Sequence, residues 1–205
     1  MESMSSSTLE PSIYLASQSP RRRELLQQIG VPHIVINASV IEVPRSHELP
    51  SEYVQRLACE KAQAGLLEVM AQCLTVKPVL GADTIVVSEG NILEKPRDAN
   101  HAAAMLRQLA GATHQVITAV ALAFEQQLMV KLSITDVVFR PLSEAEINAY
   151  WLTGEPQDKA GSYAIQGLGA VFVQQIRGSY TGVVGLPIEQ TVELLAQCGI
   201  SWWQK

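Results

Sequence analysis

Helical and strand-like segments alternate along this chain of 205 residues, and this alternation restricts its fold more than any other feature. Apolar runs that favour strands occur at 13–16, 79–80, 85–87, 114–124 and 128–139. The runs at 85–87 and 92–93 are joined by Ser88-Glu89-Gly90-Asn91, which indicates a hairpin. Strands that alternate with helices but include a hairpin predict an α/β fold with a mixed, twisted sheet flanked by helices.

Capping residues mark where the helices are expected to begin and end. Ser19 and Pro20 precede an apolar stripe and Gly30 follows it, so the first helix is expected between Pro20 and Gly30. Four more helices are expected after Ser51, from about 98 to 109, from Ser143 to Leu152, and from Pro187. The helix up to residue 152 begins with Ser143 and Glu146 at the spacing of a capping box.

The composition predicts one folded domain that follows a short extension. With 47% hydrophobic and 17% charged residues, the chain can bury a substantial core. Neither a repeat nor a Ser/Gly/Pro-rich linker occurs after Pro11, so residues 12–205 are expected to form a single domain. Residues 1–11 contain four serines and no basic residue, unlike a secretory signal or a transit peptide. We therefore expect a flexible N-terminal extension.

Apolar runs, cysteines and charge exclude several classes of function. The longest apolar run, at 116–124, is far shorter than the ~20 residues that a membrane helix needs, so no membrane association is expected. Three cysteines without CxxC spacing argue against disulfides and a zinc site, and favour a cytoplasmic location. A net charge of -5 disfavours a nucleic-acid ligand. An anionic ligand should therefore be small and locally bound.

Three arginines occupy the first turn of the first expected helix, where cations are unfavourable. This end of a helix carries roughly half a positive charge, and each cation there costs about 0.3 to 1 kcal/mol. An anion bound by Ser17, Ser19 and the guanidinium groups of Arg21 and Arg22 would remove the conflict. The alternative is a solvated basic turn in which Ser19 simply caps the helix.

Asp83 interrupts an otherwise apolar strand pattern within Gly81-Ala82-Asp83-Thr84. A carboxylate buried in a strand needs a cation, a metal or a shifted pKa, so this residue is a candidate for chemistry. The alternative is an acid in a tight turn that bonds to its own backbone. Lys95 and Arg97 follow the predicted hairpin and can reach the same anion, although surface charge is the commoner explanation for such a pair.

The segment 158–169 contains three glycines in nine residues without the spacing of a dinucleotide-binding loop. Glycines allow the backbone to approach a flat ligand closely. The amide of Gln166 can both donate and accept a hydrogen bond, which matches the edge of uracil or thymine. A glycine-bearing loop without any function is the alternative.

Taken together, four motifs of this chain resemble the Maf proteins, which are nucleotide pyrophosphatases. The motifs are SxSPRR, GADT, EKPRD and DKAGSYxIQG, and their order and spacing agree from Ile13 to Gly199. The resemblance is strongest to the branch that acts on dTTP and UTP, whose selectivity positions correspond to Arg21, Thr84 and Gln166. It implies a Maf/ITPase-like fold with two lobes around a nucleotide-binding cleft, and a homodimer.

The resemblance also implies the roles of individual residues. Asp83 would accept the proton of the attacking water, and Asp83 with Glu42 would hold Mg²⁺ or Mn²⁺. Ile41 stands where the family has the aspartate of an Asp-Glu pair, so the metal site has one acid fewer than the common pattern. The residues expected to bind the phosphates of a nucleoside triphosphate are Ser17, Ser19, Arg22, Lys61 and Lys95.

The implied activity is hydrolysis of dTTP and UTP to the monophosphate and diphosphate. Modified pyrimidine triphosphates are further candidate substrates, which would make this a house-cleaning enzyme. The alternative is a protein that is not an enzyme: a nucleotide-sensing regulator of cell division that has the same pocket but needs no catalysis.

Overall fold

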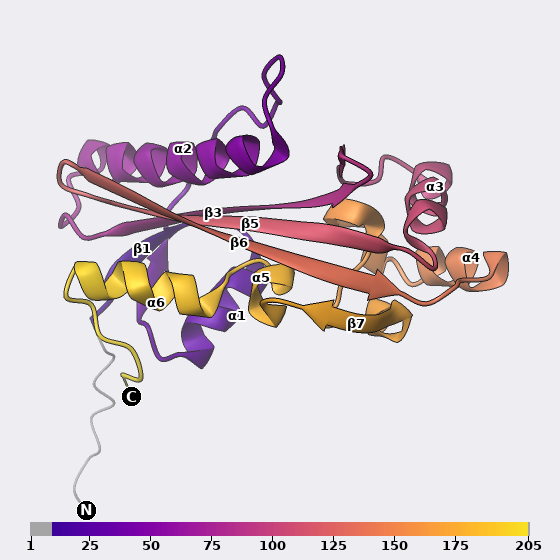
Figure 1. Ribbon diagram of the computed structural model, residues 1–205. Helices are drawn as coiled ribbons and strands as arrows, with labels where there is room; N and C mark the ends of the chain where they lie inside the picture. The colour runs from indigo at the N-terminus through magenta and orange to yellow at the C-terminus, as the bar shows by residue number, and fades with distance from the viewer. Residues whose placement is uncertain (1–9, 205) are drawn as a thin grey trace, which may run out of the picture.

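Seven strands form one twisted sheet in the computed structural model, which describes residues 10–204 (Figure 1). The strands are Ile13–Ala16 (β1), His33–Val35 (β2), Val79–Ser88 (β3), Asn91–Leu93 (β4), Thr113–Phe124 (β5), Gln127–Phe139 (β6) and Val173–Arg177 (β7). Their order is β2-β1-β3-β5-β6-β7, with β4 paired to β3. β1 is parallel to β2 and β3, whereas the other pairs are antiparallel. The expected mixed α/β sheet is therefore confirmed.

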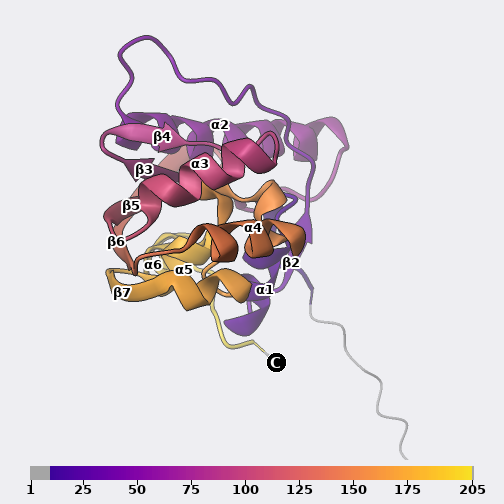
Figure 2. The ribbon, with the colours of Figure 1, turned by 90° about the vertical axis from the view of Figure 1, so that its right-hand side faces the viewer.

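Helices cover both faces of the sheet. They are Pro20–Gln28 (α1), Pro50–Ala71 (α2), Ala99–Leu109 (α3), Glu144–Leu152 (α4), Tyr180–Val184 (α5) and Ile188–Gln197 (α6). The long helix α2 lies on one face, and α1, α5 and α6 lie on the other (Figures 1 and 2). The long strands β3, β5 and β6 run from the region between α2 and α6 to a second end of the molecule, which carries α3 and α4 (Figure 1). Short 3₁₀ turns there span Glu155–Asp158, Ala160–Ser162 and Leu168–Phe172.

The core is divided between the two faces of the sheet. The larger cluster packs residues such as Leu15, Leu26 and Leu194 beneath the sheet and continues to Phe139 at the second end. The smaller cluster packs α2, including Leu57, against β3 and β5. Each fully buried leucine contributes about 1.5 to 3 kcal/mol, so the smaller cluster holds α2 against β3.

Gly81 allows α2 and β3 to approach unusually closely. A Cβ atom at this position would overlap the carbonyl oxygen of Ala58 and the backbone nitrogen of Ala62, both in α2. Any larger residue at position 81 would therefore push the helix from the strand. The close approach at Gly81 brings Lys61 of α2 next to Asp83, two residues further along β3.

Most of the expected helix and strand ends are confirmed. Ser143 and Glu146 form the expected capping box, and Gly30 follows α1 with a φ of 66°. Ser19 occupies the N-cap position of α1, but its side chain makes no capping hydrogen bond. The separate apolar runs at 79–80 and 85–87 are one continuous strand, β3. The short elements β2, β7 and α5 were not expected, because none has a long periodic pattern.

The extension predicted at residues 1–11 falls largely on residues 1–9, which lie outside the described residues.

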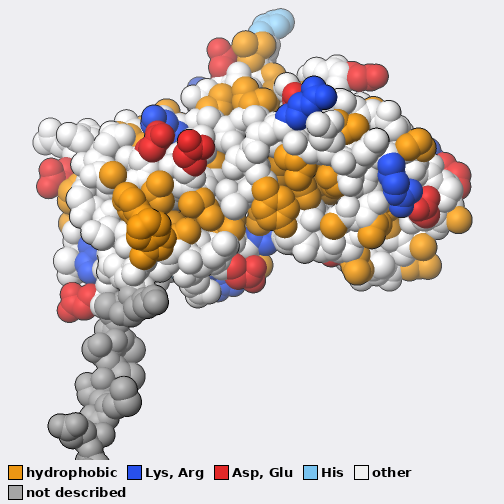
Figure 3. All heavy atoms as spheres, turned by 60° about the horizontal axis from the view of Figure 1, so that its bottom comes forward, with side chains coloured by type: hydrophobic (Ala, Val, Ile, Leu, Met, Phe, Trp, Pro, Cys, Tyr) orange, Lys and Arg blue, Asp and Glu red, His pale blue; other side chains and the backbone are white. Residues whose placement is uncertain are grey.

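None of the helices within residues 10–204 combines the length and the apolar character needed to cross a membrane. The face in Figure 3 carries apolar patches between scattered acidic and basic side chains rather than one broad basic surface.

Candidate active site

A cleft of about 660 Å³ lies between the β1–α1 turn and the segment 158–166. This volume is in the range of about 300 to 1,000 Å³ that is typical of small-molecule sites. Its walls come from the β1–α1 turn, α2, β3, the segment 92–95 and the segment 158–166. All ten residues to which the family resemblance gave a role line this cleft: Ser17, Ser19, Arg21, Arg22, Glu42, Lys61, Asp83, Thr84, Lys95 and Gln166.

The buried residues Asp83 and Lys61 form an ion pair in the wall of the cleft, and the exposed Glu42 pairs with the same lysine. Asp83 is 7% exposed and pairs with Ala119 across the β3–β5 ladder. The Nζ atom of Lys61 lies 2.7 Å from Oδ1 of Asp83 and 2.6 Å from Oε1 of Glu42. Asp83 therefore lies within a strand and not in a tight turn, and Lys61 is not a solvated helix lysine.

The two carboxylates that pair with Lys61 have pKa values shifted in opposite directions. Burial raises the pKa of Asp83, and the nearby charges of Lys61 and Arg22 offset this only in part. Burial also acts to raise the pKa of Glu42, but the hydrogen bond and charge of Lys61 and the charge of Lys95 outweigh it and lower the pKa. A carboxylate with a raised pKa suits proton transfer, whereas one with a lowered pKa stays an anion.

Arg22 joins three parts of the cleft. Its Nε donates to the carbonyl oxygen of Gly185 at 2.8 Å, one terminal nitrogen donates to Oγ of Ser17 at 3.0 Å, and the other donates to Oγ1 of Thr84 at 3.1 Å. The Thr84 hydroxyl oxygen also lies 3.0 Å from that of Thr118, which donates to the carbonyl oxygen of Gly182 at 2.8 Å. Because a guanidinium has five N–H groups, Arg22 keeps two for an anion while it positions Ser17 and Thr84.

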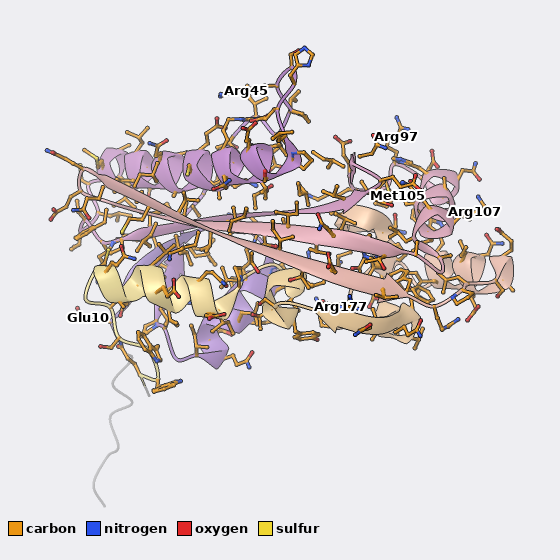
Figure 4. All side chains as sticks on the ribbon, viewed as in Figure 1. Glu10, Arg45, Arg97, Met105, Arg107 and Arg177 are labelled. Carbon is orange, nitrogen blue, oxygen red and sulfur yellow. The ribbon has the colours of Figure 1, made fainter. Side chains whose placement is uncertain are left out.

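Other site candidates face the cleft without partners of their own. Among residues 10–204, the side chains of Arg21, Lys95 and Gln166 make no hydrogen bond or ion pair. Charged and amide groups that line a cleft in this way are available to a ligand. Arg97, in contrast, is exposed beside α3 and does not line the cleft (Figure 4), so the expectation that it reaches the same anion is wrong.

The structure adds residues to the site that the sequence reasoning had not singled out. Lys159 and Asp158 are paired with each other and both line the cleft. Their only signal in the sequence was their place in the glycine-bearing segment. Thr118 belongs to the network around Thr84, but a threonine in a strand gives no signal that would distinguish it from other strand residues.

Asp83 and Glu42 are the carboxylates that could hold a divalent cation in the cleft. The part of the chain that the structure describes contains no cluster of three or more His, Cys, Asp or Glu side chains that could hold a metal by itself. Mg²⁺ is commonly held by one or two carboxylates together with substrate phosphates, and Asp83 and Glu42 supply that number. Ile41 is 81% exposed and does not line the cleft, so its presence leaves the carboxylates of Asp83 and Glu42 in place.

Sequence comparisons assign the chain to a family. The family described as Maf-like protein matches residues 12–198. A dTTP/UTP pyrophosphatase of Saccharophagus degradans is 56% identical over 192 residues, which cover 94% of this chain and 91% of that protein. A dTTP/UTP pyrophosphatase of Shigella dysenteriae is 57% identical over 185 residues, which cover 90% of this chain and 92% of that protein. A nucleoside triphosphate pyrophosphatase of Shigella flexneri is 56% identical with the same coverage.

The family match extends from the strand β1 into the helix α6 and beyond it to residue 198, and it includes every residue that lines the cleft. The chain therefore belongs to the Maf family.

Proposed function

We propose that this protein hydrolyses dTTP and UTP to the nucleoside monophosphate and diphosphate. The observation that carries the proposal is the buried carboxylate of Asp83, which lies in a cleft together with Lys61, Arg21 and Lys95. Phosphoryl transfer needs an oriented nucleophile and cations that neutralise the phosphate oxygens, and this cleft offers groups for both tasks. The names of relatives that are 56–57% identical support the same reaction and the same substrates.

Asp83 acts as the general base in this mechanism. Water attacks a phosphorus atom of the anhydride between the α and β phosphates while its proton passes to the Asp83 carboxylate. A new P–O bond forms, the bridging P–O bond breaks, and its electron pair leaves with the departing phosphate group. Attack at either phosphorus gives the same two products. The ammonium of Lys61 holds the carboxylate in place through the 2.7 Å hydrogen bond to its Oδ1.

The cationic side chains of the cleft bind the triphosphate. Arg21 and Lys95 have no partner within residues 10–204 and can contact phosphate oxygens directly. Ser17 and Ser19 contribute hydroxyl and backbone groups at the N-terminal end of α1, where an anion is favoured. Asp83 and Glu42 would hold Mg²⁺ or Mn²⁺, which supplies charge neutralisation at the phosphates when it is bound.

Base selection rests on Gln166 in the opposite wall. One amide can form two hydrogen bonds with a ring that presents an N–H beside a carbonyl, as uracil and thymine do. Cytosine presents a ring acceptor and an amino donor instead, so a fixed amide leaves buried polar groups unpaired. A homodimer and a house-cleaning role for modified pyrimidine triphosphates remain predictions of the family resemblance, and a cytoplasmic location remains a prediction from the cysteines.

A panel of UTP, dTTP, CTP and GTP, each with Mg²⁺ or Mn²⁺, tests this proposal. Phosphorus NMR should show monophosphate and diphosphate from UTP and dTTP, with much slower reaction of CTP and GTP. Binding of UTP measured by calorimetry without any turnover would contradict the proposal and favour the nucleotide-sensing alternative. Release of inorganic phosphate in place of diphosphate would contradict the assigned bond cleavage.

A further inference from the structure

A single carboxylate, that of Glu155, holds the loop that carries Gln166. Oε1 of Glu155 accepts a hydrogen bond from the backbone nitrogen of Leu168 at 2.9 Å. Oε2 accepts one from the backbone nitrogen of Gly169 at 2.9 Å and one from the hydroxyl of Tyr150 at 2.6 Å. Neither Glu155 nor Tyr150 lines the cleft, so both can affect it only through the backbone of the loop.

Tyr150 extends this arrangement to the other side of Gln166. Its hydroxyl oxygen accepts a hydrogen bond from the backbone nitrogen of Ala164 at 3.1 Å. The ring is 5% exposed and packs edge-on against Phe172, with centroids 4.9 Å apart. The backbone is therefore held at position 164 and again at 168–169, and Gln166 lies between these two points.

The glycines of this loop fit the same contacts. A Cβ atom at Gly167 would overlap the carboxylate of Glu155, and one at Gly169 would come within 2.6 Å of the Tyr150 hydroxyl oxygen. These two glycines therefore admit Glu155 and Tyr150, and not a flat ligand as the sequence suggested. The glycines and the two side chains behind them form one unit, which we call the Glu155 clamp and define as Tyr150, Glu155, Gly167 and Gly169.

The side chain of Gln166 has no such support. It is exposed, and within residues 10–204 it makes no hydrogen bond of its own. An amide that is free to rotate can match uracil or cytosine equally well, because a rotation of about 180° exchanges its donor and its acceptor. Discrimination therefore requires neighbours in the cleft that fix the orientation of the amide, and the backbone of residues 164–169 decides which neighbours the amide meets.

We propose that Glu155 and Tyr150 are positioning residues that set the discrimination between uracil or thymine and cytosine by fixing the backbone on both sides of Gln166. The inference rests on the proposed function, because it concerns the base-binding wall of the same cleft. It gives a selectivity role to two side chains that do not contact the nucleotide.

The test uses Glu155→Gln in the full chain, with Glu144→Gln as the matched control. The Gln amide presents a donor to at least one backbone N–H of Leu168 or Gly169, so the clamp loses acceptors without a change of shape. Glu144 pairs with the exposed Arg107 on the surface and does not line the cleft. For wild type and both variants, kcat and KM are measured for UTP and CTP, and dissociation constants are measured by calorimetry.

The UTP to CTP ratio of kcat/KM should fall at least fivefold in Glu155→Gln, chiefly through a higher KM for UTP, with kcat for UTP changed less than threefold. Tyr150→Phe should shift the ratio in the same direction by a smaller factor. If Glu155→Gln does not fold, the ratio measured for Tyr150→Phe tests the inference. Glu144→Gln should match wild type. Hydrogen exchange of the segment 160–172 should become faster in both clamp variants.

An unchanged UTP to CTP ratio in a folded Glu155→Gln or Tyr150→Phe protein would overturn the inference. An equal fall in kcat for both nucleotides would also overturn it, because it would identify a general structural role. Failure of the proposed function has a different signature, since wild type would then hydrolyse neither nucleotide. In that case the ratio of dissociation constants for UTP and CTP tests the clamp in the same way.

Discussion

The two walls of the cleft are built in different ways. The phosphate wall consists of charged side chains on regular elements, with Lys61 on α2 and Asp83 on β3 held together by the close approach at Gly81. The base wall is an irregular segment of short 3₁₀ turns, and its backbone is held by the side chain of Glu155. In the proposed mechanism, the catalytic residues are thus attached to the core of the sheet, whereas base selection depends on a few hydrogen bonds. This difference predicts that the two properties can be changed independently.

Asp83→Asn should give the largest effect. The amide keeps the shape of the side chain but removes the charge that accepts the proton, so turnover of UTP should fall by about 10² to 10⁴. Steady-state rates and circular dichroism on the same samples provide the measurement. A folded variant that keeps most of its turnover would show that Asp83 is not the base.

Lys61→Met tests whether the phosphate wall depends on its buried ion pair. Loss of the ammonium leaves Asp83 and Glu42 close together without the cation between them, and removal of one partner of a buried pair costs about 3 kcal/mol or more. Urea unfolding should show this loss. Lys131→Met is the matched control, because Lys131 pairs with Glu193 on the surface at 2.7 Å and such pairs contribute about 0 to 1 kcal/mol. Equal losses in the two variants would contradict the assigned role of Lys61.

Acid should weaken the core behind the base wall through His114. This side chain is 2% exposed, its Nε2 lies 2.9 Å from the hydroxyl oxygen of the cleft residue Tyr163, and burial lowers its pKa to about 4. The unfolded chain takes up this proton near pH 6.5, so the contribution of His114 is complete above that pH and is lost as the pH falls toward 4. The lost contribution to the free energy of unfolding amounts to about 2 to 3 kcal/mol at pH 4.

Urea unfolding of wild type and His114→Gln between pH 7 and pH 4 measures this loss. The wild-type free energy of unfolding should decrease more steeply than that of the variant, because glutamine does not titrate. Parallel curves would show that His114 is not the group responsible.

The wild-type selectivity for the base should be of intermediate size. Unpaired buried polar groups cost about 1 to 3 kcal/mol, so CTP should react about 5- to 150-fold more slowly than UTP. Gln166→Glu removes the donor and adds a negative charge, and it should lower activity on UTP and dTTP more than any residual activity on GTP. Equal rates of wild type on CTP and UTP would refute the role of Gln166 and leave the assigned reaction unaffected.

Arg21→Ala should have the smallest effect on stability. Removal of a cation from the N-terminal turn of α1 should leave the stability unchanged or raise it by about 0.3 to 1 kcal/mol, while nucleotide binding becomes weaker. Arg23→Ala is the matched control, since Arg23 is exposed in the same turn and does not line the cleft. Calorimetry with UTP and thermal unfolding separate the two variants. A less stable Arg21→Ala protein with unaltered binding would identify Arg21 as a structural residue.

The sequence predicted the phosphate wall better than the base wall. Asp83 was visible because an acid interrupts an apolar strand, and the arginines of α1 were visible because they occupy the wrong end of a helix. The pairing of Lys61 with Asp83 was not predictable, since it depends on the packing of α2 against Gly81 across the fold. Glu155 gave no signal at all, because an acid beside a turn resembles any surface residue until its partners at 168 and 169 are known.

The separation of chemistry from selection is tested most directly by one comparison of Asp83→Asn with Gln166→Glu. For each variant, the affinity for UTP and CTP is measured by calorimetry and the hydrolysis rate is measured in a single turnover. Asp83→Asn should keep the wild-type ratio of affinities for UTP and CTP while its hydrolysis rate falls by about 10² or more. Gln166→Glu should lose most of that ratio and keep measurable hydrolysis of bound UTP. Loss of the affinity ratio in Asp83→Asn, or complete loss of hydrolysis in a folded Gln166→Glu, would contradict the account.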